Sequence, residues 1–170
     1  MGTSALLRAR LDETAISLSC LGGNKDDNVT RVAVQLIRAK RLYGGVPYAY
    51  ASVAPPGALV FTAGACPIDE NEAIVGAGDT CVQARQAVIN LTEALAAAGA
   101  GLTDVLKTTV YVVSSDPAEL AAAWDVIQAA FGDHDVPSTL VGVTALGYAG
   151  QLVEVEAVAV AGVSGDSAQP

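Results

Sequence analysis

Between residues 79 and 131 the spacing of apolar residues changes from a helical period to a strand period and back to a helical one. This order of helix, strand and helix limits the folds that the chain can adopt. From Asp79 to Ala100, apolar and small residues recur at alternating intervals of three and four, which predicts an amphipathic helix. Residues 105–113 are rich in β-branched and aromatic side chains and predict a strand. Asp116 and Pro117 then supply a helix cap and a proline at the first helical position, so a second helix is expected to follow.

Three further segments complete the predicted sheet. Residues 58–63 form a short apolar run after a Pro-Pro-Gly turn, and residues 138–144 and 152–161 follow the second helix. This order of strands and helices predicts an α+β domain, in which a single sheet carries two helices on one face. Two helices cover only one side of such a sheet. The other face must meet water or a second subunit, which favours a symmetric oligomer.

Composition divides the chain into three parts. At 170 residues the chain is long enough for one domain, which can bury about 70% of its unfolded surface. We expect that domain to span residues 43–162. Residues 1–42 contain a turn-rich Gly, Asn and Asp stretch and are interpreted as a poorly ordered N-terminal extension, and residues 163–170 as a polar tail.

Charge and cysteine content argue against several classes of function. The formal net charge of −9 repels phosphate backbones, so nucleic-acid binding is disfavoured. Apolar runs are too short and too interrupted to span a bilayer. Three cysteines without a CxxC pair and a single histidine indicate free thiols and no metal site. We therefore expect a cytoplasmic protein that binds neither nucleic acid nor a membrane.

Two carboxylates stand inside the apolar run of residues 152–161. Strand alternation places Glu154 and Glu156 on one face, together with Val158 and Val160. One interpretation is a half-solvated sheet with its charges directed outward. The other is a carboxylate in a cleft, suited to work as a general acid or base.

A set of short motifs, in this order and spacing, resembles the RidA (YjgF) family of enamine and imine deaminases. The resemblance covers about residues 45–162 and implies a chorismate-mutase-like fold. It also implies a homotrimer that binds a small molecule in clefts between neighbouring subunits, with no cofactor and no metal. The motifs are Pro47–Tyr50, Leu59–Gly64 with Pro67, Gln83–Ala87 with Asn90, Ala96–Ala100, Asp104–Tyr111, Phe131–His134 and Leu152–Ala159.

The resemblance assigns roles to two kinds of side chain. In active members a glutamate of the last strand positions water, and this residue corresponds to Glu154. A tyrosine near the first strand helps to close the site, and it corresponds to Tyr50, or to Tyr48 if the gap is placed differently.

Three other residues complete the expected cleft. The backbone N–H of Leu140 and the carbonyl near Gly64 flank the cleft in the family. Tyr148, in the turn before the last strand, is either an aromatic wall of the site or a residue that stabilises the turn.

The chain departs from the family where active deaminases carry an arginine that binds the substrate carboxylate. Strand alternation puts Ser138 at that position, whereas alignment of the prolines puts Thr139 there, and neither is basic. Ala63 stands where those deaminases have a pocket serine. The chain thus resembles an arginine-lacking branch. Because charge-assisted pairs are the strong ones, amino-acid-derived iminoacids should bind poorly and a neutral or cationic ligand should fit better.

Four other basic residues are candidates to replace the arginine. Arg85 and Lys107 are interpreted as facing solvent or pairing with an acid. Arg38 and Arg41 could reach a neighbouring cleft if the extension is ordered.

The expected activity is hydrolysis of a reactive imine or enamine, with Glu154 as the base that positions water. The alternative is a non-catalytic trimeric module that binds a metabolite or a partner protein. A ribonuclease is disfavoured because the net charge is −9 and there is no pair of histidines.

Overall fold

The computed structural model describes residues 33–162 of the chain, which contain six strands, two α-helices and one short 3₁₀ helix. In chain order these elements are β1 (Gln35–Ile37), β2 (Ala51–Val53), β3 (Ala58–Phe61), α1 (Thr80–Ala97), a 3₁₀ helix (Leu102–Asp104), β4 (Val105–Val113), α2 (Pro117–Phe131), β5 (Ser138–Val143) and β6 (Val153–Ala161).

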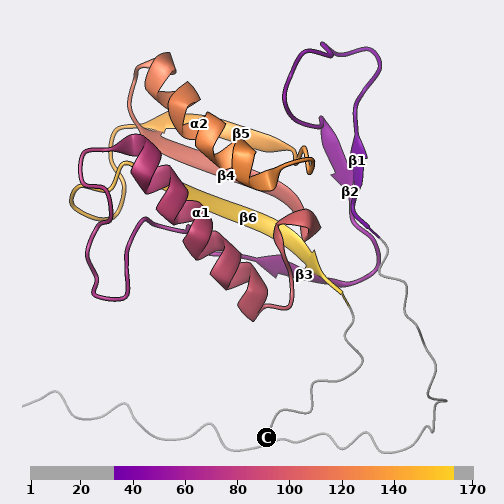
Figure 1. Cartoon of the computed structure of the whole chain (residues 1–170). Helices are drawn as coiled ribbons and strands as arrows, with labels where there is room; N and C mark the ends of the chain where they lie inside the picture. The colour runs from indigo at the N-terminus through magenta and orange to yellow at the C-terminus, as the bar shows by residue number, and fades with distance from the viewer. Residues whose placement is uncertain (1–32, 163–170) are drawn as a thin grey trace, which may run out of the picture. The chain divides into compact units, whose positions relative to one another are not determined.

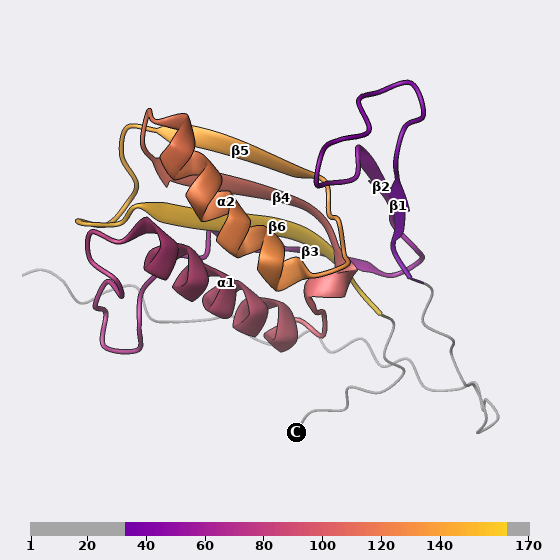
Figure 2. The ribbon, with the colours of Figure 1, turned by 45° about the horizontal axis from the view of Figure 1, so that its top comes forward.

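The main sheet has four strands in the order β3-β6-β4-β5. β4 and β5 are parallel and are joined through α2, while β6 is antiparallel to both β3 and β4. Figures 1 and 2 show α1 and α2 on the same side of this sheet. The predicted α+β fold, with two helices on one face, is confirmed. The opposite side is called the uncovered face below.

Both helices begin at the residues that the sequence predicts. The Asp79 carboxylate accepts a hydrogen bond of 2.9 Å from the backbone N–H of Val82, and the Asp116 carboxylate accepts one of 2.9 Å from Ala118. These side chains satisfy N–H groups that have no partner inside the helix. After α1 the chain turns at Gly99, whose φ of 72° is readily adopted by glycine.

Strand alternation separates the core from the uncovered face. In β4 and β6 every second residue packs beneath the helices, which yields a single hydrophobic core. The principal members of this core are Ala84, Ala87, Leu91, Leu95, Val105, Val110, Val112, Ala123, Ile127, Val153, Val155, Ala157 and Ala159.

One buried amide connects α1 to the loop before β6. The Gln83 side chain is fully buried, and its Nε2 donates to the carbonyls of Gly76 at 3.2 Å and Gly150 at 2.9 Å. Its Oε1 accepts a 2.7 Å hydrogen bond from the N–H of Leu152. Gln83 thereby satisfies three backbone groups and fixes the start of β6, the strand that carries Glu154.

One strand of a short second sheet lies where the sequence predicted a poorly ordered extension. β1 pairs with β2 in antiparallel register, so residues 35–37 form a strand and the boundary expected at residue 42 falls in the connection between the two strands. The Ser52 hydroxyl of β2 donates to the carbonyl of Leu106 at 2.7 Å. The remainder of the expected extension, residues 1–32, and the tail at 163–170 lie outside the described residues.

Within residues 33–162, neither helix combines the length and the apolar character needed to cross a membrane.

Two positions of α1 differ in burial, so truncation of their side chains should change the free energy of unfolding by different amounts. Leu91 is 0% exposed, whereas Ile89 is 50% exposed. Leu91→Ala should lower the free energy of unfolding by about 2–5 kcal/mol, since it removes apolar contacts and leaves a cavity. Ile89→Ala should change it by only about 0.5 kcal/mol. Chemical denaturation of both variants measures the difference, and equal losses would contradict the described packing.

Candidate functional site

Glu154 lies on the uncovered face, near the start of β6 and opposite Tyr111 of β4. Its side chain is partly buried. Three other residues surround its carboxylate: Gly64, Cys66 and Gln151. These four residues are called the Glu154 cluster.

Gln151 holds one oxygen of the carboxylate. It is only 3% exposed, and its Nε2 donates to Glu154 Oε2 at 2.9 Å and to the carbonyl of Val153 at 3.2 Å. Its Oε1 accepts a hydrogen bond of 3.1 Å from the N–H of Tyr148. Since each end of the amide is bonded, Gln151 restricts the orientation of Glu154.

Cys66 is the second donor to the same oxygen. Its Sγ lies 3.4 Å from Glu154 Oε2 and 3.6 Å from the carbonyl of Gly64. Burial, together with the hydrogen bond to Glu154 and its charge, raises the pKa of the Cys66 thiol to about 11. At neutral pH the thiol therefore keeps its proton and acts as a donor to the carboxylate, not as a nucleophile.

Gly64 allows the carboxylate to lie directly against the main chain. Any Cβ at this position would collide with Glu154 Oε1. On either side, Thr62 pairs with Ala157 and Ala65 with Val155, so that residues 63 and 64 face a single residue of β6. This two-against-one arrangement is that of a β-bulge, a feature that often re-aims side chains beside functional sites.

The geometry of the cluster suits base chemistry. Gln151 and Cys66 both bond to Oε2, which leaves Oε1, beside Gly64, able to accept a proton from a bound water. The donors that hold the carboxylate are neutral, so they orient it without neutralising its charge.

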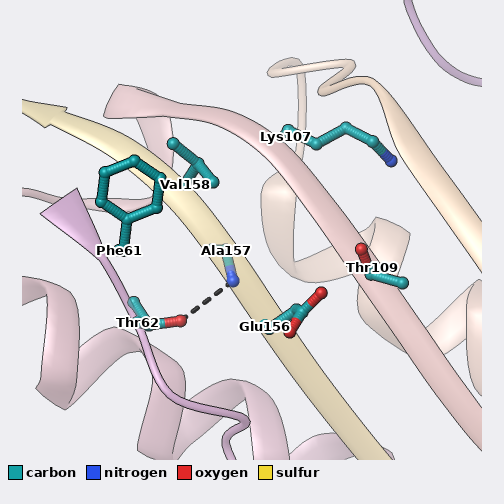
Figure 3. Close-up of a pocket in the computed structure, with 7 residues that line it drawn as sticks. All are labelled: Phe61, Thr62, Lys107, Thr109, Glu156, Ala157 and Val158. Atoms are coloured by element: carbon teal, nitrogen blue, oxygen red, sulfur yellow. Dashed lines mark hydrogen bonds between the residues drawn. The ribbon is translucent and has the colours of Figure 1, made fainter. Parts of the chain in front are cut away.

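Glu156 has different surroundings although it lies on the same face. Its Oε1 accepts a hydrogen bond of 3.0 Å from the Tyr111 hydroxyl, an interaction that raises the pKa of Tyr111. Glu156 also lines a pocket of about 160 Å³, drawn in Figure 3, to which Lys107 contributes from β4. The two carboxylates of β6 therefore lie in different surroundings.

The two candidates for the arginine position point to opposite faces. Ser138 lies opposite Thr108 in parallel register, and their hydroxyl oxygens are 2.6 Å apart. Thr108 is buried beneath the helices, so Ser138 faces that side as well. Thr139 lies on the uncovered face, where its Oγ1 accepts a hydrogen bond of 2.6 Å from Lys107 Nζ.

Within one chain, Ser138 and Glu154 do not share a site. Ser138 is aligned with Ala157 through β4, which puts it two strands and three residues from Glu154. That separation is roughly 10 Å across the sheet and roughly 10 Å along it. Leu140, two residues after Ser138 in β5, packs its side chain against the core.

The two tyrosines of the expected site contact other parts of the chain. The ring of Tyr48 meets the ring of Trp124 edge to face, with 6.4 Å between centroids, and the ring of Tyr50 at 6.0 Å. The Tyr50 hydroxyl donates to the carbonyl of Tyr43 at 2.6 Å. These contacts place both tyrosines beside α2 and the β1–β2 loop, and no described hydrogen bond joins them to Glu154.

Two remaining candidates lie near the cluster. Ala63 precedes Gly64 in the bulge and is exposed. Tyr148 is also exposed, and its backbone N–H, not its ring, is linked to the cluster through Gln151.

The sequence did not predict a role for Gln151, which binds the Glu154 carboxylate, or the contacts of Cys66 with Glu154 and of Lys107 with Thr139. Gln151 is a polar residue immediately before an apolar strand, and its position three residues before Glu154 was the available signal.

Among residues 33–162, no group of three or more His, Cys, Asp and Glu side chains is placed to hold a metal ion.

The Cys66 thiol reports directly on its contact with Glu154. In a Cys20→Ser, Cys81→Ser background, alkylation rates measured against pH should give a Cys66 pKa of about 11. Glu154→Gln should lower this pKa, because the anionic acceptor is lost, but burial should keep it above the ordinary thiol value. Glu156→Gln is the matched control and should leave it unchanged. Equal pKa values in the two variants would rule out the described contact.

Comparison with known proteins identifies the family of the chain. The Endoribonuclease L-PSP family model matches residues 40–161. A RutC family protein of Pyrococcus horikoshii is 36% identical over 110 residues, which are 65% of this chain and 85% of that protein. A 2-iminobutanoate/2-iminopropanoate deaminase of Salmonella typhimurium is 35% identical over 79 residues, covering 46% of this chain and 59% of the relative.

Solved structures give the same assignment. A member of the conserved Rid protein family from Yersinia pestis, whose function is described as unknown, superposes with a TM-score of 0.71 and 32% sequence identity. The match covers 76% of this chain and 99% of that structure. The expected relationship is thus confirmed, and the chain belongs to the Endoribonuclease L-PSP family, which includes the RutC and RidA/YjgF proteins.

Proposed function

We propose that the protein hydrolyses a reactive imine or enamine, with Glu154 as the base that positions and activates water. The observation that carries this proposal is the Glu154 cluster, in which Gln151 and Cys66 bind one carboxylate oxygen and leave the other beside Gly64. The similarity to a protein named as a 2-iminobutanoate/2-iminopropanoate deaminase supports the same reaction class.

The proposed reaction needs one base and one water. Glu154 removes a proton from water as the water oxygen bonds to the carbon of a protonated C=N group, which gives a tetrahedral carbinolamine. The carboxylic acid then returns this proton to the nitrogen. The C–N bond breaks as the hydroxyl gives its proton back to Glu154 and the carbonyl forms, and ammonia or an amine leaves. No cofactor enters this scheme.

Substrate recognition is proposed to differ from that of arginine-bearing deaminases. Neither Ser138 nor Thr139 is basic, and only Thr139 lies on the same face as Glu154. A substrate held through a bidentate guanidinium contact is therefore not expected.

The uncovered face is proposed as the contact surface of a homotrimer with clefts between subunits. Two apolar side chains of β3 support this assembly, since Leu59 is 55% exposed and Phe61 is 72% exposed. The separation between Ser138 and Glu154 within one chain also fits a cleft to which two subunits contribute.

The ribonuclease activity in the family's description is not extended to this chain. The chain has one histidine and a net charge of −9. His134 Nε2 lies 2.7 Å from the carbonyl of Val105, and its ring stacks on Phe131, away from both carboxylates of β6.

Glu154→Gln tests the proposed chemistry. In an assay that follows ammonia release from imines generated in situ, kcat/KM should fall by about 10²–10⁴-fold, because a general base contributes about this much. The exposed Glu93→Gln on α1 is the control and should retain full activity. Wild-type turnover by Glu154→Gln would eliminate the mechanism. Absence of turnover in the wild type across a broad panel would favour the non-catalytic binding module instead.

Charge substitution on the uncovered face tests the assembly. Leu59→Asp should dissociate the trimer, since it would bury a carboxylate among apolar contacts. Ile89→Asp alters an apolar residue of similar exposure on α1 and should leave the assembly intact. Light scattering after size-exclusion chromatography gives the molar mass of each variant. A trimer that survives Leu59→Asp would place the interface elsewhere.

A further inference from the structure

One amide side chain of α1 is hydrogen-bonded to the loop that supplies a donor to Glu154. Asn90 is half-buried, and its Nδ2 donates to the backbone carbonyl of Cys66 at 2.7 Å and to that of Ile68 at 2.8 Å. Within residues 33–162, no hydrogen bond joins Asn90 to Glu154 itself. Any effect of Asn90 on the carboxylate must therefore pass through the loop.

The loop makes a tight turn at the residues that Asn90 contacts. The N–H of Ile68 donates to the carbonyl of Cys66 at 2.9 Å, which closes a three-residue turn around the buried Pro67. Asn90 bonds to the carbonyls at both ends of this turn. Its side chain thus fixes the main chain of Cys66, and with it the direction in which the thiol points toward Glu154 Oε2, 3.4 Å away.

A second amide sets the orientation of Asn90. Gln86, one turn earlier in α1, donates from Nε2 to Asn90 Oδ1 at 2.9 Å. Because the oxygen of the Asn90 amide is occupied by this donor, both of its N–H groups are directed at the loop. A flipped amide would instead place Oδ1 against two carbonyl oxygens. Gln86, Asn90 and Cys66 therefore form a continuous chain of hydrogen bonds from the helix to the carboxylate.

The other donor to Glu154 is held from the same helix. Gln83 lies seven residues before Asn90, which is about two turns and puts both amides on the same side of α1. Gln83 bonds to the main chain on either side of Gln151, at Gly150 and Leu152. One helix on the covered side of the sheet thus holds both loops whose side chains bond to Oε2 of a carboxylate on the uncovered face.

We propose that Asn90 is a positioning residue for Glu154, which acts through Cys66 from the opposite side of the sheet. By fixing the turn at residues 66–68, it keeps the thiol on Oε2, so that Oε1 remains the oxygen directed at water. The consequence for turnover rests on the proposed function. The consequence for the contact between Cys66 and Glu154 does not.

The Cys66 thiol reports on this positioning without any turnover. In the Cys20→Ser, Cys81→Ser background, burial and the contact with Glu154 hold the pKa of Cys66 at about 11. Asn90→Leu removes both donors and should lower this pKa, because the thiol is no longer held on the carboxylate. In Glu154→Gln the anionic acceptor is already absent, so the same substitution should lower the pKa much less.

The comparison between these two backgrounds decides the proposal. An unchanged pKa of Cys66 in Asn90→Leu would overturn it. Equal decreases with and without the Glu154 carboxylate would also overturn it, because the substitution would then only loosen the loop. Asn90→Ala adds no bulk and repeats the measurement if circular dichroism shows that Asn90→Leu is misfolded.

Thr92→Val is the matched control on the same helix. Thr92 is half-buried like Asn90, but its Oγ1 donates to the carbonyl of Val88 at 2.8 Å, within α1. The control removes a side-chain hydrogen bond of the helix without touching the loop. It should leave the pKa of Cys66 and the kinetic constants unchanged, and a change as large as that of Asn90→Leu would overturn the proposal.

Kinetics of ammonia release connect the contact with the chemistry. Asn90→Leu should lower kcat by about tenfold to hundredfold and change KM by less than about twofold, since it misdirects the base without removing a substrate contact. In Glu154→Gln it should cause no further loss, because residues that act as one unit are not additive. An unchanged kcat beside a lowered pKa of Cys66 would overturn the positioning role. If the wild type turns over no imine, the proposed function fails, and the thiol measurements alone decide whether Asn90 holds the carboxylate.

Discussion

The alternation of side chains in β4 and β6 is the constraint on which the other features depend. In both strands, every second residue is buried beneath α1 and α2, so the residues between them must lie on the uncovered face. This requirement places Glu154 and Glu156 of β6 beside Tyr111 and Thr109 of β4. A shift of one residue in register would move the carboxylates into the core and expose the valines, so the hydrophobic effect that stabilises the domain also fixes the position of its polar groups.

The two carboxylates of β6 have different neighbours although they lie on the same strand and the same face. Glu154 lies against the bulge at residues 63 and 64, where neutral donors orient it and a missing Cβ at Gly64 gives it room. Glu156 lies one pleat further along, where a tyrosine binds one oxygen and a lysine of β4 shares its pocket. The difference arises from the neighbouring strands. The segment that follows β3 contributes the bulge next to Glu154, whereas β4 contributes Lys107 to the pocket that Glu156 lines.

Much of the fold could be predicted from periodicity and capping. The ranges of α1 and α2, their caps at Asp79 and Asp116, and the four strands of the main sheet follow from local patterns. The pairing of β1 with β2 could not be predicted, because each strand has three residues, too few to display a period. Its stability comes from distant contacts, such as the Ser52 hydrogen bond to Leu106, which leave no mark on the local sequence.

The sequence by itself determined which residues share the uncovered face, because a strand period of two allows only one division of β6. It also determined the absence of an arginine at Ser138 and Thr139. Only the tertiary structure decided the partners: Gln151 and Cys66 for Glu154, Lys107 for Thr139, and Thr108 for Ser138. These contacts join residues up to 88 positions apart. Hydrogen bonds depend on distances of a few ångströms and on direction, which are set by strand register and by a bulge and not by the order of residues along the chain.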